Sequence, residues 1–367
     1  MNQGLALKVV KKSTIVDVAR EAGVSIGTVS LALNGSDLCS PITAARVRVV
    51  AAKLQYVPNH SASSLRRQTT DSIALVVPDI GNPVYVAMAK SVQRVAKERG
   101  YHLSLISTDG SSLEEAHAVN GLARRHVDGL IMCSLRASPE LGAALEAATA
   151  SVCVIGRGAG ITKVDNVQVD SELGASQAVK HLLETGRRAI AFVNGDTGTA
   201  PATARLRGFE RGMREAGLEI NPLWIFQVEF NIAGGYAVVD GLLKRCPEVD
   251  AIFCANDVIA IGVLKRLREV EIVVPKQVAV VGMDDIDECL ICTPTLTSVS
   301  LAAGDRGRIA AELLLKRLSS GTSKLEPQTI TIKPRLIVRE SSMDSLTTAN
   351  QHPKAKHLAQ ASKVKRP

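Results

Sequence analysis

Between residues 72 and 281, short apolar runs alternate with longer amphipathic segments, and this alternation limits the fold more than any other feature of the sequence. Strands are predicted at residues 73–77, 103–107, 129–133, 152–155, 189–193, 225–228, 251–254 and 278–281. Helices are predicted between them at residues 84–99, 112–126, 139–147, 171–185, 204–216, 233–244 and 257–269. Buried strands that alternate with helices are typical of parallel sheets covered on both faces. Two such series in tandem predict two doubly wound lobes, with a ligand cleft at the carboxyl ends of the strands.

The beginning of the chain has a different pattern, with three short helices predicted at residues 14–22, 26–33 and 42–55. Gly23 tolerates the positive φ of a tight turn after the first helix, and Ser25 is a favourable N-cap for the second. Two short helices joined by a glycine turn predict a helix-turn-helix, whose second helix enters the major groove of DNA. Taken alone this pattern is weak, because any small helical hairpin has a glycine and apolar residues at helical spacing.

Motifs along the rest of the chain make the interpretation specific. They are TIVDVAREAGVSIGTVS (residues 14–30), Leu33-Asn34, Tyr56-x-Pro58-Asn59, Ala62-x-x-Leu65, VVPDIGNPVY (76–85), RLRGF (205–209), CANDVIAIG (254–262), VGMDDID (281–287) and TPTLTSV (293–299). On these residues the sequence resembles the LacI family of bacterial transcription regulators, from about residue 14 to residue 342.

The resemblance implies a small all-α helix-turn-helix head and an α/β two-lobed body of the type I periplasmic-binding-protein-like kind, with doubly wound parallel sheets. The expected segments are a flexible leader (1–12), the DNA-binding domain (13–58), a hinge (59–71), an effector-binding and dimerisation domain (72–342) and a basic disordered tail (343–367). The resemblance also implies chain crossings between the lobes near residues 162–168, 292–298 and 322–330, so a helix at 303–318 should return to the first lobe.

The charge is unevenly distributed, although the whole chain has a formal net charge of +8. Residues 1–71 contain nine basic and four acidic residues, residues 341–367 contain five and one, and the body between them is nearly neutral. A basic head on a neutral body is expected of a DNA-binding module joined to a small-molecule sensor. No signal peptide and no membrane-spanning run is visible, so we expect a cytoplasmic bacterial protein, nucleoid-associated when bound to DNA, without a membrane partner.

The candidate DNA contacts lie on the second predicted helix and around it. Base edges are expected to meet Ile26, Gly27, Ser30 and Leu31, while Ser25, Thr28 and Asn34 are expected to cap the helix or touch phosphate; Thr14 and Tyr56 complete the set on the head. Position 27 has no side chain, and Leu31 stands where the family often has a polar residue. Few direct hydrogen bonds to base edges are therefore expected, and Leu31 is a candidate for contact with a thymine methyl group.

The hinge segment at residues 59–67 is too short to be a stable helix alone in water. The resemblance implies that it folds when two copies meet in the minor groove, where Leu65 wedges into a base step beside Asn59, Ala62 and Arg66. A plain linker is the alternative, and Ser63 stands where the family commonly has arginine.

Side chains near predicted strand ends are the candidates for the cleft. They are Asn82 and Tyr85 in the first lobe, and Arg205, Phe230, Asn256 and Asp284 in the second. Arg, Asp and Asn hydrogen-bond vicinal hydroxyl groups, and an aromatic face covers the apolar side of a sugar ring. The resemblance implies Arg205, Phe230 and Asp284 as effector contacts, while Asn256 is equally open to a capping role. Gly156-Arg157 stands where the family often has Asp before Arg, which leaves the polarity of the ligand open.

These features predict a homodimeric repressor that binds a pseudo-palindromic operator in double-stranded DNA and is controlled allosterically by a sugar or sugar derivative. The alternative is a regulator of the same fold that is controlled by a phosphorylated partner protein or a nucleobase co-repressor. A free sugar-binding protein is disfavoured by the head. An enzyme is disfavoured because no GxxxxGK[ST], HExxH or nucleophile elbow occurs. In Gly156-x-Gly158-x-Gly160 the third glycine does not have the spacing of a dinucleotide site, and no helix is predicted to follow.

No cofactor and no metal site is expected. Seven scattered cysteines fit buried thiols in a reduced cytosol, and the CxxC spacing of Cys289 and Cys292 has no second pair. The acidic run of Asp284, Asp285 and Asp287 imitates a metal cluster, but a helix cap and an effector contact account for two of its members.

Overall fold

The computed structural model describes residues 13–34, 36–56, 69–121, 127–136, 138–148, 151–156, 163–320 and 325–343. The chain divides into two compact units, residues 1–70 and 71–367. The predicted leader, the hinge residues 59–67, the loop at 157–162 and the tail beyond Met343 lie outside the described residues.

The described part of the first unit is a bundle of three short helices, as predicted: α1 (Ile15–Ala22), α2 (Ile26–Leu33) and α3 (Pro41–Lys53). Val18, Val29 and Val47 are fully buried at its centre. Asp17 closes a capping box at the start of α1, because its carboxylate accepts the backbone N–H of Thr14 at 2.9 Å. Gly23 ends α1 with φ +62°, a left-handed conformation that other residues adopt only at a cost.

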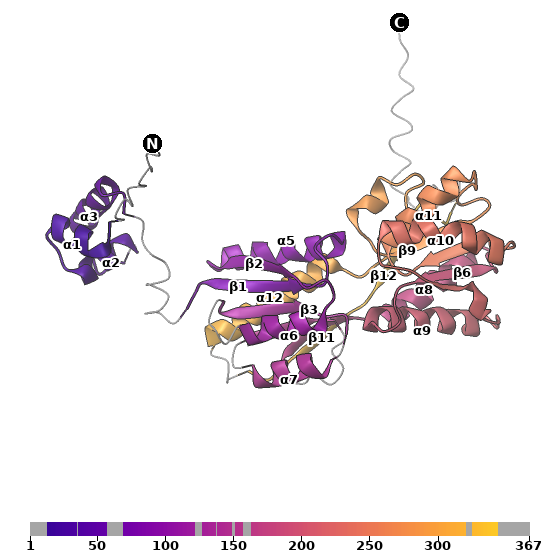
Figure 1. Ribbon diagram of the computed structural model, residues 1–367, viewed down its shortest axis with the longest axis horizontal. Coiled ribbons are helices and arrows are strands. Elements are labelled where there is room, and N and C mark those ends of the chain that lie inside the picture. Colours follow the sequence, from indigo (N-terminus) through magenta and orange to yellow (C-terminus); the bar gives the residue numbers. More distant parts are fainter. Residues whose placement is uncertain are drawn as a thin grey trace, which may run out of the picture. The chain divides into compact units, whose positions relative to one another are not determined.

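The second unit contains two six-stranded sheets, which form two lobes (Figure 1). The first sheet has the order β11-β5-β4-β3-β1-β2 and is parallel throughout. Its strands are β1 (Ser72–Val77), β2 (His102–Ser107), β3 (Gly129–Cys133), β4 (Ser151–Ile155), β5 (Asp165–Val169) and β11 (Thr329–Ile332).

The second sheet has the order β12-β10-β9-β8-β6-β7, with β12 antiparallel to β10 and the other pairs parallel. Its strands are β6 (Ile190–Asn194), β7 (Ile225–Gln227), β8 (Ala251–Cys254), β9 (Ala279–Asp284), β10 (Thr297–Ser300) and β12 (Arg335–Ile337). In each sheet the direction of winding reverses beside the first strand of the lobe, and ligands of such sheets bind at this switch point.

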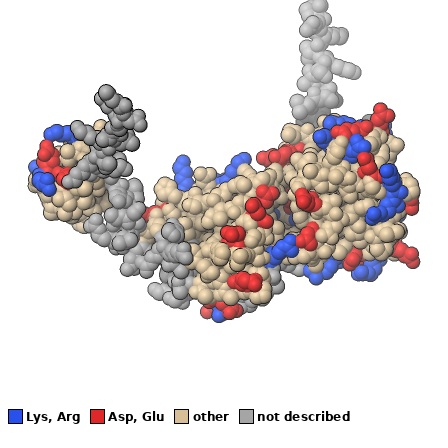
Figure 2. Space-filling model, in the orientation of Figure 1, with Lys and Arg blue, Asp and Glu red and all other residues tan. Residues whose placement is uncertain are grey.

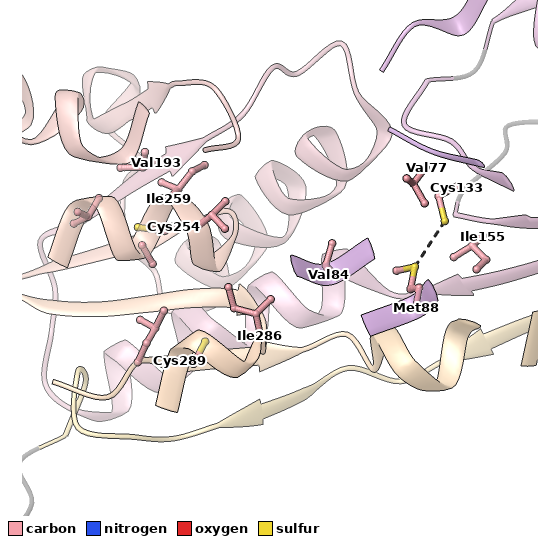
Figure 3. Close-up of a cluster of buried hydrophobic side chains, with 14 of the residues drawn as sticks. Val77, Val84, Met88, Cys133, Ile155, Val193, Cys254, Ile259, Ile286 and Cys289 are labelled. Carbon is pink, nitrogen blue, oxygen red and sulfur yellow. Dashed lines mark hydrogen bonds between the residues drawn. The ribbon is translucent and has the colours of Figure 1, made fainter. Parts of the chain in front are cut away.

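Helices cover both faces of each sheet (Figure 1). In the first lobe α5 (Pro83–Glu98) and α12 (Ala303–Ser320) lie on one face, and α6 (Ser112–Gly121) and α7 (Pro139–Ala147) on the other. In the second lobe α8 (Ser171–Glu184) and α9 (Ala200–Glu215) pair on one face, and α10 (Ile232–Arg245) and α11 (Asp257–Glu269) on the other. The apolar layer beneath these helices holds Val77 and Met88 in the first lobe and Ile259 and Ile286 in the second (Figure 3). The predicted fold class is therefore confirmed.

The chain crosses between the lobes at residues 170, 301–302 and 333–334. Each crossing lies a few residues after the range expected for it, because β5, β10 and β11 still belong to the lobe that the chain is leaving. These strands are short. Their sequences, such as DNVQV and TSVS, mix polar and apolar residues and so resemble connecting segments rather than buried strands. The helix expected to return to the first lobe does so, since α12 packs on α5, β3, β4 and β5.

A buried ion pair holds α12 to β5. Arg317 donates through Nε and Nη2 to the two carboxylate oxygens of Asp165, at 2.9 and 2.8 Å, and both side chains are less than 10% exposed. Arg317→Met should lower the free energy of unfolding of the body by about 3–5 kcal/mol, because the substitution leaves a buried carboxylate unpaired. Chemical denaturation measures this loss. Arg308→Met is the matched control, since the more exposed pairs of Arg308 on the same helix should contribute less than about 1 kcal/mol. Similar losses in both variants would contradict the structural role of Arg317.

Candidate functional site

A cavity of about 150 Å³ lies where the carboxyl ends of the two sheets face each other. It is lined from the first lobe by the segment after β1, by α5 and by the start of α12, and from the second lobe by α9, the N-cap of α11 and the end of β9. All six side chains predicted for the cleft line this one cavity: Asn82, Tyr85, Arg205, Phe230, Asn256 and Asp284.

Arg205 and Asp284 form a buried ion pair on the second-lobe wall. The Arg205 Nη2 lies 3.3 Å from the Asp284 Oδ1, and each residue is 7% exposed. Burial raises the pKa of Asp284, although the positive charges of Arg205 and Arg306 oppose that shift. The Arg205 Nε has no hydrogen-bond partner, so the guanidinium retains a free donor inside the cavity wall. A ligand hydroxyl can use both groups at once, since it donates to the carboxylate and accepts from the guanidinium.

Phe230 supplies the aromatic surface of the same wall. Its ring lies directly over Gly195, where a Cβ atom would overlap the ring, so a larger residue at this position would displace the ring. The Arg205 Cζ lies 5.9 Å from the ring centroid. The partly buried ring therefore offers an apolar face beside a charged pair, which is the combination that a sugar ring with hydroxyl groups on its edge requires.

Asn82 and Asn256 each combine a place in the cavity wall with a helix cap. Asn82 Oδ1 accepts the backbone N–H of Val84 at 3.1 Å at the start of α5, and Asn256 Oδ1 accepts that of Ile259 at 3.0 Å at the start of α11. Asn256 is only 1% exposed, which fits the structural role left open by the sequence. Tyr85 completes the first-lobe wall, and burial raises the pKa of its phenol. The capped helix ends keep these side chains in fixed positions.

Two charged residues near the cavity were not predicted. Arg306 reaches it from α12, and a signal was available, because a helix that returns to the first lobe must begin at the cleft. Asp257 is fully buried behind it, accepts the hydroxyl of Ser298 at 2.6 Å and the backbone N–H of Ile286 at 3.0 Å, and holds the loop after β9. Burial and the nearby Asp284 raise the pKa of Asp257 to about 7.

The lobes also touch at the rim of the cavity. The Arg136 Nη2 lies 2.5 Å from the Asp196 Oδ2, and the backbone N–H of Ala200 donates to the Leu135 carbonyl oxygen at 2.8 Å. Arg136 and Leu135 follow β3 in the first lobe, whereas Asp196 and Ala200 follow β6 in the second. Any change in the angle between the lobes must alter these contacts.

The head presents the outer face of α2 to solvent. Ile26 and Leu31 are 41% and 36% exposed, Ser25, Gly27 and Asn34 are exposed, and Thr28 and Ser30 are half-buried. Ser25 caps α2 by accepting the backbone N–H of Thr28 at 3.1 Å. Tyr56 packs against the small core, and Thr14 is occupied in the capping box, so both have structural roles on the head.

The predicted acidic cluster has basic partners. Asp284 pairs with Arg205, and Asp285 pairs with Arg339 at 2.7 Å. Within the described part of the chain, no group of three His, Cys, Asp or Glu side chains is arranged to hold a metal ion. Basic and acidic side chains are interspersed over the face of the body seen in Figure 2. Among the same residues, no helix combines the length and apolar character needed to cross a bilayer.

Comparison with known proteins agrees with this arrangement. Residues 14–59 match the model of bacterial regulatory proteins of the lacI family, and residues 179–342 match that of a periplasmic binding protein-like domain. The transcriptional regulator CelR of Thermobifida fusca is 35% identical over 338 residues, which cover 90% of this chain and 98% of CelR. The chain belongs to the LacI family.

Two further similarities support the family assignment. The transcriptional repressor PurR of Histophilus somni is 32% identical over 330 residues, which cover 90% of this chain and 98% of PurR. A solved complex of the regulator CelR with cellobiose has a TM-score of 0.68 and 34% identity, and covers 90% of this chain and 99% of that chain. This LacI-family chain is a helix-turn-helix transcription regulator with a ligand-sensor body. The predicted hinge contacts Asn59, Ala62, Leu65 and Arg66 lie outside the described residues.

Proposed function

We propose that this LacI-family regulator is a homodimeric repressor whose affinity for a pseudo-palindromic operator is set by a sugar or sugar derivative in the cavity between the lobes. The observation that carries the proposal is the convergence of Arg205, Asp284 and Phe230 on one wall of that cavity. The cellobiose complex of the relative CelR supports a sugar as the ligand class. No catalytic role is proposed, because the cavity carboxylate Asp284 is already paired with a guanidinium and the family regulates transcription in the bacterial cytoplasm.

The proposed control uses the angle between the lobes. A ligand that contacts both walls stabilises one angle over another, and only a difference in affinity between the two arrangements shifts their populations. The rim pair of Arg136 with Asp196 joins the lobes at one such angle. A changed angle would alter the spacing of the two hinge segments in a dimer and so the fit of the heads to the operator.

The proposal of a homodimer draws on the edge of the first sheet. β2 is the outermost strand there, and all its residues except Leu103 are exposed. Leu105 and Ile106 are 40% and 39% exposed, and an exposed apolar edge strand is normally covered by another chain. A second copy of the body would bury this edge and bring two heads to the two half-sites of an operator.

Removing the head separates the two proposed roles of the chain. Residues 72–342 expressed alone should remain folded and dimeric and should bind the effector, because both sheets and every described cavity residue lie within them. They should not bind the operator. Size-exclusion chromatography with light scattering and a gel-shift assay measure the two properties, with the full chain as control. Specific operator binding by the truncated body would place DNA recognition outside the head.

A further inference from the structure

Arg306 is a buried cation without a partner among the residues that the structure describes. It is the fourth residue of α12, at the point where the chain re-enters the first lobe, and it lines the cavity. The residue is 8% exposed and its Nε makes no hydrogen bond. Of the described carboxylates, none lies within ion-pair distance of its guanidinium.

The two other arginines that are buried among the described residues have acidic partners. Arg317 meets Asp165 through two hydrogen bonds, and Arg205 meets Asp284. A buried guanidinium without such a partner loses part of its hydration, and no carboxylate compensates for that loss. Burial accordingly lowers the pKa of Arg306, while the charge of Asp284 opposes the shift. An arrangement of this kind is costly in the absence of ligand.

The position of α12 prevents Arg306 from moving out into water. Gly307 sits against the backbone of α5, where a Cβ atom would lie 2.6 Å from the Met88 carbonyl oxygen. Gly304 approaches the same helix, since a Cβ there would lie 3.2 Å from the Ser91 Oγ. Because the helices are this close, the first turns of α12 are held in place and the Arg306 side chain is directed to the cavity.

The buried charges that line the cavity do not balance, whereas Asp257 and Glu115 are buried behind its wall and do not line it. Arg205 and Arg306 contribute two positive charges, and Asp284 contributes one negative charge. Asp79 also lines the cavity, but it is exposed, and its carboxylate accepts the backbone N–H of Gly81 at 2.7 Å. Glu115 lies behind the wall, where it accepts the hydroxyl of Ser134 at 2.8 Å. The buried groups that face the cavity from the described elements thus leave one positive charge in excess.

We propose that the effector carries an oxyanion, a carboxylate or a phosphate, which binds Arg306 while Arg205, Asp284 and Phe230 hold the polyol part of the molecule. This inference rests on the proposed function and narrows its ligand class to sugar acids and sugar phosphates. The planar guanidinium matches either oxyanion with two parallel hydrogen bonds, and a site shielded from water strengthens them. The position of Arg306 on the first lobe, opposite the Arg205 pair on the second, also means that such a ligand would join the two lobes.

The test uses the full chain and matched sets of ligands. Glucose, glucuronate and glucose 6-phosphate form one set, and galactose, galacturonate and galactose 6-phosphate form another. Calorimetric titration should show tightest binding for an acid or a phosphate, and the preferred member distinguishes the two sources of the oxyanion. Arg306→Met should weaken the binding of that member by about tenfold to hundredfold and should leave the affinity for the neutral sugar within about twofold of the wild type. Arg306→Lys should keep part of the affinity, and Arg308→Met, on the exposed side of α12, should keep all of it.

A second measurement needs no ligand. Arg306→Met should raise the thermal midpoint of the ligand-free protein, because an unpaired buried cation is replaced by an apolar side chain of similar length. A lower midpoint for Arg306→Met would make Arg306 structural and overturn the inference. The inference would also be overturned if the wild-type chain bound neutral and charged ligands with equal affinity and Arg306→Met left those affinities unchanged. That result would leave the proposed function intact. If no member of either set binds the wild-type chain, the result counts against sugar sensing itself, while the midpoint of the ligand-free variant still decides the role of Arg306.

Discussion

Arg205→Ala is expected to weaken effector binding by about tenfold to hundredfold while operator affinity in the absence of effector stays within a few-fold. The reason lies in the buried pair with Asp284, where a charge-assisted hydrogen bond to a ligand hydroxyl contributes on the order of 1.5–3 kcal/mol. Asp284→Ala should have a similar effect. The double substitution should remove the effector response at any practical concentration, although its effect should be smaller than the sum of the two, because the residues contact each other.

Fluorescence anisotropy with labelled operator, with and without effector, measures both affinities in these variants. Arg207→Ala is the matched control, since Arg207 lies on the same helix but is 54% exposed and pairs with Glu172 at 3.5 Å on the outer surface. Its response to effector should equal that of the wild type. A normal response in the double variant of Arg205 and Asp284 would show that the effector binds somewhere other than this cavity.

Leu65→Ala is expected to weaken operator binding by at least about 100-fold, with a much smaller effect on random DNA. From the sequence, residues 59–67 are expected to be too few and too rich in serine to be helical unaided, and the proposed hinge therefore relies on a partner copy and DNA for its order. Leu65 is the large apolar side chain of that segment, flanked by small residues and by Arg66-Arg67. In the proposed dimer, truncation would remove burial that offsets base unstacking, at roughly 2–3 kcal/mol per side chain for each of two copies.

Salt dependence separates this wedge from an ordinary phosphate contact. Leu65→Ala should leave the dependence of log K on log salt nearly unchanged, because no phosphate contact is lost. Arg66→Ala is the control, and it should weaken operator and random DNA alike and flatten the salt dependence. Equal losses on operator and random DNA for Leu65→Ala would identify the segment as a plain linker.

The fold was predictable where burial leaves a regular pattern in the sequence. The apolar strands such as β3 and β8, and helices with strong caps such as α11 after Asn256, were predicted with the bounds that the structure shows. The strands β5, β10, β11 and β12 were not predicted, because they are short and partly polar and exist only through pairing with distant strands. The start of α9 at Ala200 was also missed, since Pro201 in the first turn resembles a helix breaker and is instead tolerated there.

The cavity was predictable to the extent that its residues follow strands. Asp284 and Asn256 come directly at the ends of β9 and β8, so the geometry of a doubly wound sheet brings them together. Arg306 follows no strand, and the sequence signal for it was its place at the start of a helix expected to return to the first lobe. In the sequence it belongs to the polar run Gly-Asp-Arg-Gly-Arg, which reads as an exposed first turn, and only the packing of α12 against α5 buries it.

The central claim is that a ligand in the cavity between the lobes changes the affinity of the head for DNA. The direct measurement is the dissociation constant of the full chain for an operator, selected from a pool of random duplexes, in the presence and absence of a ligand that stabilises the isolated body. Linkage between the two sites predicts a change of about fivefold to 150-fold in operator affinity and the same factor in ligand affinity when operator is added. That change should vanish in Arg205→Ala with Asp284→Ala. A ligand that binds the cavity of the wild-type chain and leaves the operator dissociation constant unchanged would contradict the account.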